Sequence, residues 1–277
     1  MPHSMVFHCV AEEDLDGSIL RGQGFRDLVF QLLERLHPQL SQQVAGARRR
    51  PFTVSPFFAK RRPPEPRGDH QREDRRFRGQ TIKAGTPCRF RLTLLEDRLY
   101  HDMARLIGAS TLGLSVDGRG LRVTHILSSR QESDPWPRSQ TYGQLHEEAS
   151  STLRELRLQF VTPTTFIRHG GALPLPDPQI TFEGFLRSWN WFAFLPLSSD
   201  LERLIDHRIL LKDFRISATT YDTGEGKRPS FTGWCQFVLV GRHHEKHIRE
   251  FNLLADYSFY CGTGDYTDMG MGVTQRL

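Results

Sequence analysis

Two groups of basic residues flank a short apolar run, PFTVSPFF at 51–58. They are Arg48, Arg49 and Arg50 before it and Lys60, Arg61 and Arg62 after it. Between residues 48 and 91 the chain has 14 Lys and Arg against 4 Asp and Glu, a local charge of +10, whereas the rest carries −5. Such a concentration of charge indicates a polyanionic partner, because Lys and Arg neutralise phosphates whatever the sequence. The alternative interpretation is a solvated basic loop without a ligand.

Glycines recur near the end of the sequence, in CGTGDYTDMGMG at 261–272. They are Gly262, Gly264, Gly270 and Gly272, with Tyr266 and Thr267 between them. Glycine permits positive φ angles and close approach to a ligand, so such a loop can bind phosphate through its N–H groups. The pattern is neither a P-loop, whose lysine is absent, nor a dinucleotide fingerprint, because here the predicted helix precedes the glycines. A flexible terminus without a ligand is the alternative.

Twelve histidines supply side chains that can transfer protons near pH 7. His243 and His247 lie four residues apart in HHEKH on a predicted helix, where two imidazoles can share a metal. Polar residues exposed on the first helical turn explain the same spacing, and we favour that interpretation. We therefore expect no metal and no other cofactor.

The composition is that of an ordinary globular protein. The residues are 38% hydrophobic and 25% charged, with a net charge of +5, and this composition excludes wholesale disorder. The length of 277 residues suffices for about two domains. Cys9, Cys88, Cys235 and Cys261 are scattered, without the CxxC pair of a zinc ribbon. No apolar run reaches the roughly 18 residues of a membrane span, and no secretory signal is visible. A cytoplasmic protein without membrane contact is the expectation.

The first half of the chain is predicted to alternate strands and helices. β-Branched and aromatic runs predict strands at 4–11, 51–58, 88–95 and 120–129. Apolar spacing predicts helices over 21–44 and 96–108, the first broken at Pro38, where a short helix at 38–45 can begin. Residues 60–80 are charged and Pro-rich, which predicts a mobile loop. The resulting order, βαββαβ, is ferredoxin-like.

The second half repeats this order without repeating the sequence. Strands are predicted at 153–162, 208–222 and 230–241, helices at 181–194 and 243–261, and a possible last strand within 262–277. We therefore expect an α+β protein with two tandem ferredoxin-like domains, similar to RNA-recognition motifs. They would occupy residues 1–130 and 151–277, joined by a linker at 131–150 that is rich in Pro, Ser and Gly.

Three segments follow one another in an order and spacing that match a known family. RPFTVSPFF at 50–58 is similar to its second strand, written KPFTxSPL. LQFVTPTTFIRHGG at 158–171, with LPLPDP and FEGFLRSWNWF after it, resembles its FxTPTxF…PxP…L…WN stretch. GTGDYTDMGMG at 262–272 is similar to its terminal GxGxxTxxGxG loop. The family is that of the CRISPR-associated repeat-RNA endoribonucleases called "Cas six", which cut precursor CRISPR RNA.

The resemblance implies tandem ferredoxin-like domains and metal-independent cleavage on the 3′ side of a repeat. A 2′-hydroxyl attacks the phosphate and leaves a 2′,3′-cyclic phosphate and a 5′-hydroxyl. A histidine that exchanges the proton and a Lys or Arg that stabilises the phosphate charge suffice for this reaction. The expected RNA-binding residues are Arg48, Arg49, Arg50, Lys60, Arg61, Arg62, Gly262, Gly264, Tyr266, Thr267, Gly270 and Gly272.

The chain departs from the family at the position that matters most for catalysis. Family members commonly carry the catalytic histidine in a stretch like LHDxxxxKPFT, and alignment on PFT places that position at Ala45. Alanine cannot transfer a proton. The histidine was lost naturally, or it was substituted deliberately, or another one such as His37 replaces it. The family's loop also often has basic residues where Asp265 and Tyr266 stand, and Tyr266 can stack on a base instead.

Two functions remain open. The first is an endoribonuclease that acts on CRISPR repeat RNA and can retain its product. The second is a catalytically inactive subunit that holds the 3′ handle of the guide RNA in an effector complex, with other subunits of that complex as partners. A structural protein without RNA is disfavoured by the basic residues between 48 and 91.

Overall fold

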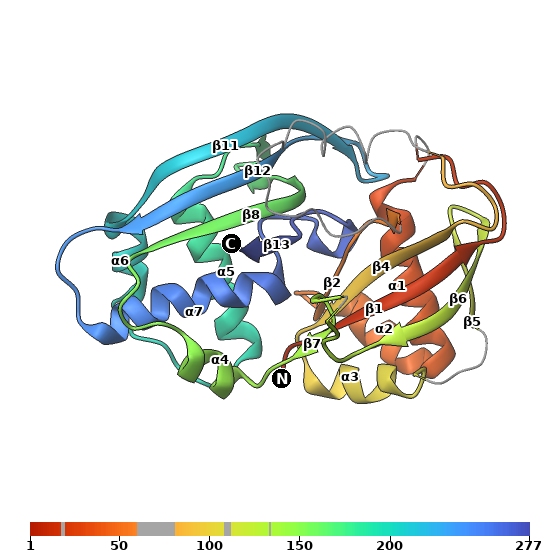
Figure 1. The fold of residues 1–277 in the computed structure, drawn as a ribbon, viewed down its shortest axis with the longest axis horizontal. Helices are drawn as coiled ribbons and strands as arrows, with labels where there is room; N and C mark the ends of the chain where they lie inside the picture. The colour runs from red at the N-terminus through yellow and green to blue at the C-terminus, as the bar shows by residue number, and fades with distance from the viewer. Residues whose placement is uncertain (18–19, 60–80, 108–111, 133) are drawn as a thin grey trace.

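Two α+β domains lie side by side in the computed structural model, which describes residues 1–17, 20–59, 81–107, 112–132 and 134–277 (Figure 1). The loop predicted at 60–80, with Lys60, Arg61 and Arg62, lies outside the described residues. Among the residues that are described, no helix is both long and apolar enough to cross a membrane.

The first domain is built on one antiparallel sheet with helices on one face. Its elements are β1 (His3–Ala11), α1 (Gly22–Leu36), α2 (Pro38–Gly46), β2 (Phe52–Val54), β3 (Phe58–Ala59), β4 (Pro87–Leu94), α3 (Asp97–Ala104), β5 (Leu112–Val116) and β6 (Arg119–Leu127). The main strand order is β2-β4-β1-β6-β5, which is ferredoxin-like with β5 added at one edge. The predicted helices and the strands predicted at 4–11, 88–95 and 120–129 are confirmed. The strand predicted at 51–58 is divided into β2 and β3, and β5 was not predicted.

The core of this domain is formed by apolar residues that alternate along the strands and by apolar residues at helical spacing on α1. Met5, Phe7 and Cys9 alternate on β1 and are buried under α1. On α1, Phe25, Leu28, Val29, Leu32 and Leu33 form one buried face. Pro38 starts α2 at its first turn, because proline there lacks only an N–H that a helix start leaves unpaired.

The segment predicted as a linker, 131–150, contains two short elements among its described residues. Its elements are β7 (Arg138–Ser139), which pairs with β1, and α4 (Tyr142–Glu148). Thr141 and Gln144 form a capping box at the start of α4, in which each side chain accepts the other residue's backbone N–H. These two elements were not predicted, because the Pro, Ser and Gly content outweighed this Thr-x-x-Gln signal; the division into domains at 131–150 stays a prediction.

The second domain repeats the ferredoxin-like order. Its elements are β8 (Glu155–Thr164), β9 (Phe166–Arg168), β10 (Gly171–Leu173), α5 (Pro178–Phe192), α6 (Leu201–Arg208), β11 (Ile209–Asp222), β12 (Lys227–Leu239), α7 (Glu245–Cys261), the 3-10 helix η2 (Thr267–Met269) and β13 (Thr274–Arg276). The main sheet has the order β11-β12-β8-β13, with every neighbour antiparallel. The prediction of tandem ferredoxin-like domains is confirmed, whereas α6 and the β9–β10 hairpin were not predicted.

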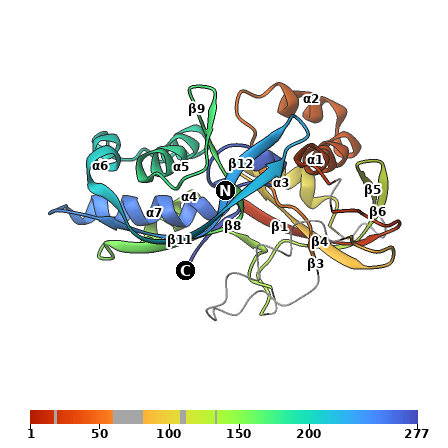
Figure 2. The ribbon, with the colours of Figure 1, turned by 90° about the horizontal axis from the view of Figure 1, so that it is seen from above.

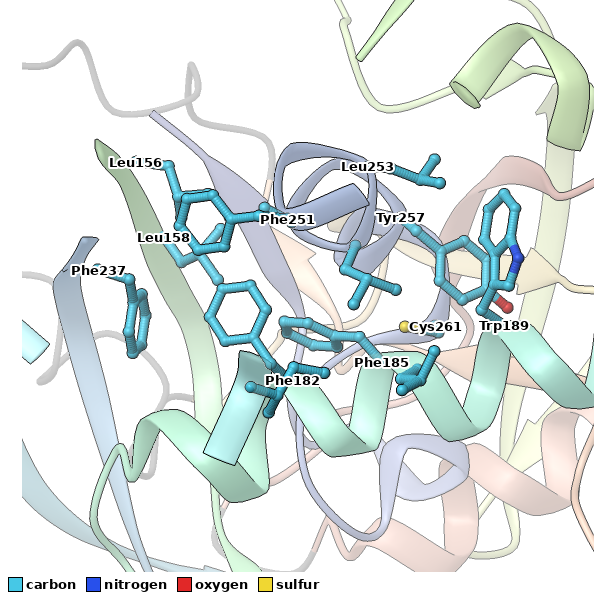
Figure 3. Close-up of a cluster of buried hydrophobic side chains, with 14 of the residues drawn as sticks. Leu156, Leu158, Phe182, Phe185, Trp189, Phe237, Phe251, Leu253, Tyr257 and Cys261 are labelled. Atoms are coloured by element: carbon cyan, nitrogen blue, oxygen red, sulfur yellow. The ribbon is translucent and has the colours of Figure 1, made fainter. Parts of the chain in front are cut away.

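Aromatic packing fixes α7 against α5. Figure 3 shows Phe182, Phe185 and Trp189 of α5 facing Phe251 and Tyr257 of α7. The rings of Phe182 and Phe251 stack with their centres 5.2 Å apart. Each such fully buried side chain stabilises the fold by about 1.5–3 kcal/mol. This packing sets the position of the last turn of α7, from which the glycine-rich loop begins.

The end of α7 and the loop after it are docked onto the first domain. The hydroxyl groups of Thr53 and Thr93 donate to the carbonyl oxygen of Tyr260, at 3.3 and 2.7 Å. A Cβ at Gly22, the first residue of α1, would lie 2.8 Å from the carbonyl oxygen of Met269 in η2. The glycine-rich loop is therefore held at the junction of the two domains.

Candidate nucleic-acid interface

The glycine-rich loop, residues 262–272, folds back closely on the protein. A Cβ at Gly264, whose φ is +80°, would lie 2.2 Å from the carbonyl oxygen of Thr165. A Cβ at Gly272, whose φ is +70°, would lie 2.1 Å from the carbonyl oxygen of Thr263. Glycine is required at both positions, because φ is positive there and because a side chain would collide with a neighbouring backbone carbonyl of the protein itself.

Several N–H groups of the loop already have partners inside the protein. Gly262 donates to the carbonyl oxygen of Ser258, and Gly272 donates to that of Pro163. These two glycines are also buried, so here they shape the loop and present no N–H group to a ligand. Buried Gly270 has a φ of +91° beside Tyr221. RNA contact by Gly264, Tyr266 and Thr267, which are at least partly exposed, stays a prediction.

Asp268 connects the loop to two arginines of the first domain. Its Oδ2 lies 2.9 Å from Nε of Arg26 on α1 and 3.8 Å from Nε of Arg50. The Arg50 guanidinium also donates to the carbonyl oxygens of Val44 and Ala45 at the end of α2. Arg50 was predicted to contact RNA, and in this structure it ties α2 to the loop.

Arg49 and Arg187 bring positive charge together from the two domains. Arg49 follows α2, Arg187 lies on α5, and both guanidinium groups act on the carboxyl of Asp265. Partial burial lowers the pKa of Arg49, and the charge of Arg187 lowers it further. In the described part of the chain, no carboxylate lies within 4.0 Å of either guanidinium. Their charge is therefore available to an external anion.

Asp265 is held beside these arginines by the backbone of the β9–β10 hairpin. Its Oδ2 accepts the N–H of Ile167 at 2.6 Å, and its own N–H donates to the carbonyl oxygen of Thr165. Partial desolvation raises the pKa of Asp265, while the Ile167 bond and the charges of Arg187 and Arg49 oppose that increase. The carboxyl therefore competes with an external anion for the two arginines only when it is ionised.

Tyr266 presents an aromatic ring at the same end of the loop. Its φ of +60° is uncommon for a residue with a side chain, and the Arg228 guanidinium lies 5.2 Å from its ring centre. We call Arg48, Arg49, Arg187, Arg228 and Tyr266 the junction surface. Arg48 is exposed and Tyr266 is half-buried. Sequence reasoning missed Arg187 and Arg228, which no basic run marks.

The β9–β10 hairpin adds a basic tip that the sequence analysis did not single out. Arg168 and His169 are exposed there, and His169 and Gly170 have φ angles of +51° and +78°. Consecutive positive φ angles are typical of a two-residue hairpin turn, so the Arg-His-Gly-Gly segment was the available signal. Figure 2 shows the hairpin extending on the side of the molecule that carries α1, α2 and α5.

The two candidate catalytic positions lie at opposite ends of α2. Ala45 is exposed in its last turn, where its carbonyl oxygen accepts from Arg50. His37 is exposed at the junction of α1 and α2, and its carbonyl oxygen accepts the N–H groups of Leu40 and Ser41. Eight residues of helix separate them by roughly 12 Å. Only Ala45 lies beside the loop anchor formed by Arg50 and Asp268.

His243 and His247 contact separate protein groups. Nε2 of His243 lies 2.7 Å from the carbonyl oxygen of Val240, and Nε2 of His247 lies 3.2 Å from a carboxylate oxygen of Asp200. Searched over its described residues, the chain holds no group of three or more His, Cys, Asp or Glu side chains that could bind a metal ion.

The fold and the site together define a class of protein. It has two tandem ferredoxin-like domains, a glycine-rich loop docked between them, and arginines from both domains at their junction. Comparison with protein-family models identifies the "CRISPR Cas6 N-terminal domain" over residues 1–147 and the "CRISPR-associated endoribonuclease Cas6" family over residues 158–274. The chain belongs to the Cas6 family of CRISPR-associated endoribonucleases.

Relatives of known name and structure agree with this assignment. A CRISPR-associated endoribonuclease Cas6 of Mycobacterium tuberculosis is 26% identical over 122 residues, which cover 43% of this chain and 38% of the relative. The product complex of a Cas6 (TTHB231) is 26% identical with a TM-score of 0.81 and full coverage of both chains. Thermus thermophilus Cas6 (TTHB231) is 24% identical with a TM-score of 0.74, covering 100% of this chain and 98% of that one.

Proposed function

We propose that this chain binds CRISPR repeat RNA on the junction surface and processes precursor CRISPR RNA there. The observation that carries the proposal is the convergence of Arg49 and Arg187 on Asp265 without an ion-pair partner among the described residues. Two guanidinium groups from different domains that act on one carboxyl can attract one phosphate, and charge-assisted bonds between guanidinium and phosphate are strong. The similar Cas6 solved as a product complex supports RNA as the ligand.

The cleavage step needs only groups that side chains provide. The 2′-oxygen of the nucleotide before the cut forms a bond to phosphorus as it gives its proton to a base, and the bond to the 5′-oxygen breaks as that oxygen takes a proton from an acid; in this chain His37 or water is the candidate for that exchange. The products are a 2′,3′-cyclic phosphate and a 5′-hydroxyl. Arg49 and Arg187 stabilise the negative charge that develops on the phosphate, which is commonly the largest catalytic contribution.

A second candidate function is favoured by one observation at α2. Position 45, which is exposed beside the Arg50 anchor, carries a methyl group that can neither accept nor donate a proton. His37 lies at the far end of α2. A chain that binds repeat RNA but lacks the acid–base group would act as a subunit that holds the 3′ handle in an effector complex. The partner subunits and the cytoplasmic location stay predictions.

The experiment that tests the proposal separates binding from cleavage. RNA of the CRISPR repeat from the same genome is incubated with excess protein in EDTA, and both retention on a filter and the chemical ends of products are measured. Tight binding that weakens in Arg49→Ala and Arg187→Ala, but not in Arg203→Ala on exposed α6, supports the proposal. Equal affinity for the repeat and for a shuffled RNA, unaffected by Arg49→Ala, would contradict it.

A further inference from the structure

A cavity of about 400 Å³ lies where β7, α4, α7 and β13 meet, apart from the junction surface. Its lining includes the rings of Trp136 and Phe259, the guanidinium groups of Arg138 and Arg276, and the carboxylates of Glu148 and Asp256. The chain end that follows β13 and the β9–β10 hairpin lie on opposite sides of the molecule (Figure 2). Two lining residues, Gln275 and Arg276, lie on β13 directly before that chain end.

A buried cation without a counter-ion lies behind the aromatic wall of this cavity. Arg91 on β4 is 2% exposed, and none of its three guanidinium nitrogens has a hydrogen-bond partner among the described residues. The guanidinium carbon lies 4.7 Å from the ring centre of Trp136 and 4.6 Å from that of Phe259. Burying a charge without a paired anion is costly, so this arrangement needs an explanation.

A second guanidinium packs on the same aromatic ring. The guanidinium carbon of Arg138 lies 3.4 Å from the ring centre of Phe259, and its Nε is buried without a hydrogen-bond partner among the described residues. Burial and, to a smaller extent, the charge of Arg138 together lower the pKa of Arg91 to about 9. The two like charges therefore repel each other in a poorly solvated place.

The carboxylates near these two arginines already have other partners. Asp256 accepts from Arg276 at 2.9 Å, and Glu148 accepts from the Gln140 amide at 2.8 Å. Asp134 is paired with Arg89. Neither Arg91 nor Arg138 has a carboxylate within 4.0 Å among the described residues, although the charge of Asp256 still acts on Arg138, which lines the cavity.

We propose that this cavity is a binding site for a phosphate group, with Arg138 as the direct ligand and Arg91 as a buried positive charge behind it. An anion in the cavity would be attracted by both guanidinium groups, and the low polarity of the aromatic wall would strengthen that attraction. The volume exceeds that of inorganic phosphate, so a phosphate carried by a mononucleotide or by an RNA strand can enter. This site is independent of RNA binding on the junction surface.

The test measures thermal unfolding of the full chain in low salt with inorganic phosphate, AMP or a five-nucleotide RNA. The RNA arm uses an Arg49→Ala, Arg187→Ala background, so that the junction surface does not contribute. At ten times Kd, the bound phosphate group is expected to raise Tm by roughly 3–5 °C. Whichever of the three compounds gives the largest shift at equal concentration identifies the source of the phosphate.

Variants decide whether the shift belongs to this cavity. Arg138→Gln should weaken binding at least about tenfold, because it removes a charge-assisted contact. Arg91→Met should abolish the shift while leaving the Tm of the free protein equal or higher, since it removes an uncompensated buried charge. Arg203→Gln, on exposed α6, should retain the full shift. No shift in the unmodified protein, or an equal shift in Arg138→Gln, would overturn the proposal even if Arg91→Met does not fold.

Discussion

Oδ2 of Asp268 lies 2.9 Å from Nε of Arg26, and this ion pair joins the glycine-rich loop of the second domain to the first helix of the other. The Asp268 side chain is 12% exposed and that of Arg26 is 22% exposed, so the pair is mostly shielded from water. The same carboxylate also faces Arg50, which bonds the end of α2. The loop, α1 and α2 are therefore positioned by one acidic residue.

Replacing that acidic residue tests its role in holding the loop. Asp268→Asn removes the carboxylate that faces Arg26 and Arg50, leaving Arg26 only its 3.4 Å pair with the more exposed Glu225, and is expected to lower the free energy of unfolding by about 1.5–3 kcal/mol. Urea denaturation measures the change. Glu13→Gln, which removes an exposed pair with Arg119, is the control and should change stability by less than about 0.5 kcal/mol. Equal effects of the two substitutions would contradict the assigned role.

Glycine substitutions test the close backbone approach in the loop. Gly264→Ala introduces a Cβ 2.2 Å from the carbonyl oxygen of Thr165 at a positive φ, so it should destabilise the protein by at least about 2 kcal/mol. Gly184→Ala on α5 meets nothing within 4 Å, and it should stabilise the helix by about 0.5–1 kcal/mol. Thermal unfolding compares the two. A Gly264→Ala protein as stable as the unmodified chain would show that the loop can relax.

Salt dependence tests phosphate contact on the junction surface. Each phosphate neutralised on single-stranded RNA contributes about 0.7 to the slope of log K against log salt concentration. Arg49→Ala and Arg187→Ala should each reduce that slope by about this amount, whereas Arg50→Ala should reduce it less because Arg50 is paired with Asp268. Titrations of repeat RNA at several salt concentrations measure the slopes. An unchanged slope in Arg49→Ala and Arg187→Ala would show that these arginines do not contact phosphate.

The raised pKa of Asp265 predicts a dependence of RNA affinity on pH. At a pH above this raised pKa, the Asp265 carboxylate is ionised and competes with phosphate for Arg49 and Arg187. When the pH falls below the pKa, the carboxyl is neutral, the competition disappears and the affinity for RNA should rise. Asp265→Asn still accepts the Ile167 N–H, so it should bind RNA roughly two- to fivefold more tightly at pH 7 and lose this pH dependence. Affinity measured from pH 7 to pH 4.5 tests both expectations. Parallel pH profiles for the two proteins would exclude competition by Asp265.

The regular elements of both domains were predictable because their apolar residues follow strand or helix periods. Phe182, Phe185 and Trp189 show this, since they lie on one face of α5 both in the sequence pattern and in the structure. Short elements defined by turns and caps were missed. The β9–β10 hairpin depends on positive φ at His169 and Gly170, and α4 depends on the box of Thr141 and Gln144.

The candidate site was less predictable because tertiary contacts decide which arginines are available. Arg48, Arg49 and Arg50 are consecutive in the sequence, but their partners differ. Arg50 faces the carboxylate of Asp268 and donates to the end of α2, whereas Arg49 has no ion-pair partner in the described part of the chain. Arg187 lies on α5 of the second domain and acts on Arg49 of the first across the junction of the two domains. No spacing in the sequence encodes that approach.

The central claim is that this chain binds repeat RNA on the junction surface and lacks an acid–base group at position 45. Its most direct test is a single-turnover cleavage rate in EDTA for the unmodified chain, for Ala45→His and for His37→Ala. We predict slow cleavage by the unmodified chain, because its arginines stabilise the phosphate charge without an acid–base group at position 45, and an increase of about 10²–10⁴-fold in Ala45→His with little change in affinity. Absent cleavage by the unmodified chain would favour the second candidate function, the RNA-holding subunit. Fast cleavage by the unmodified chain that is lost in His37→Ala would contradict the claim and assign the proton transfer to His37.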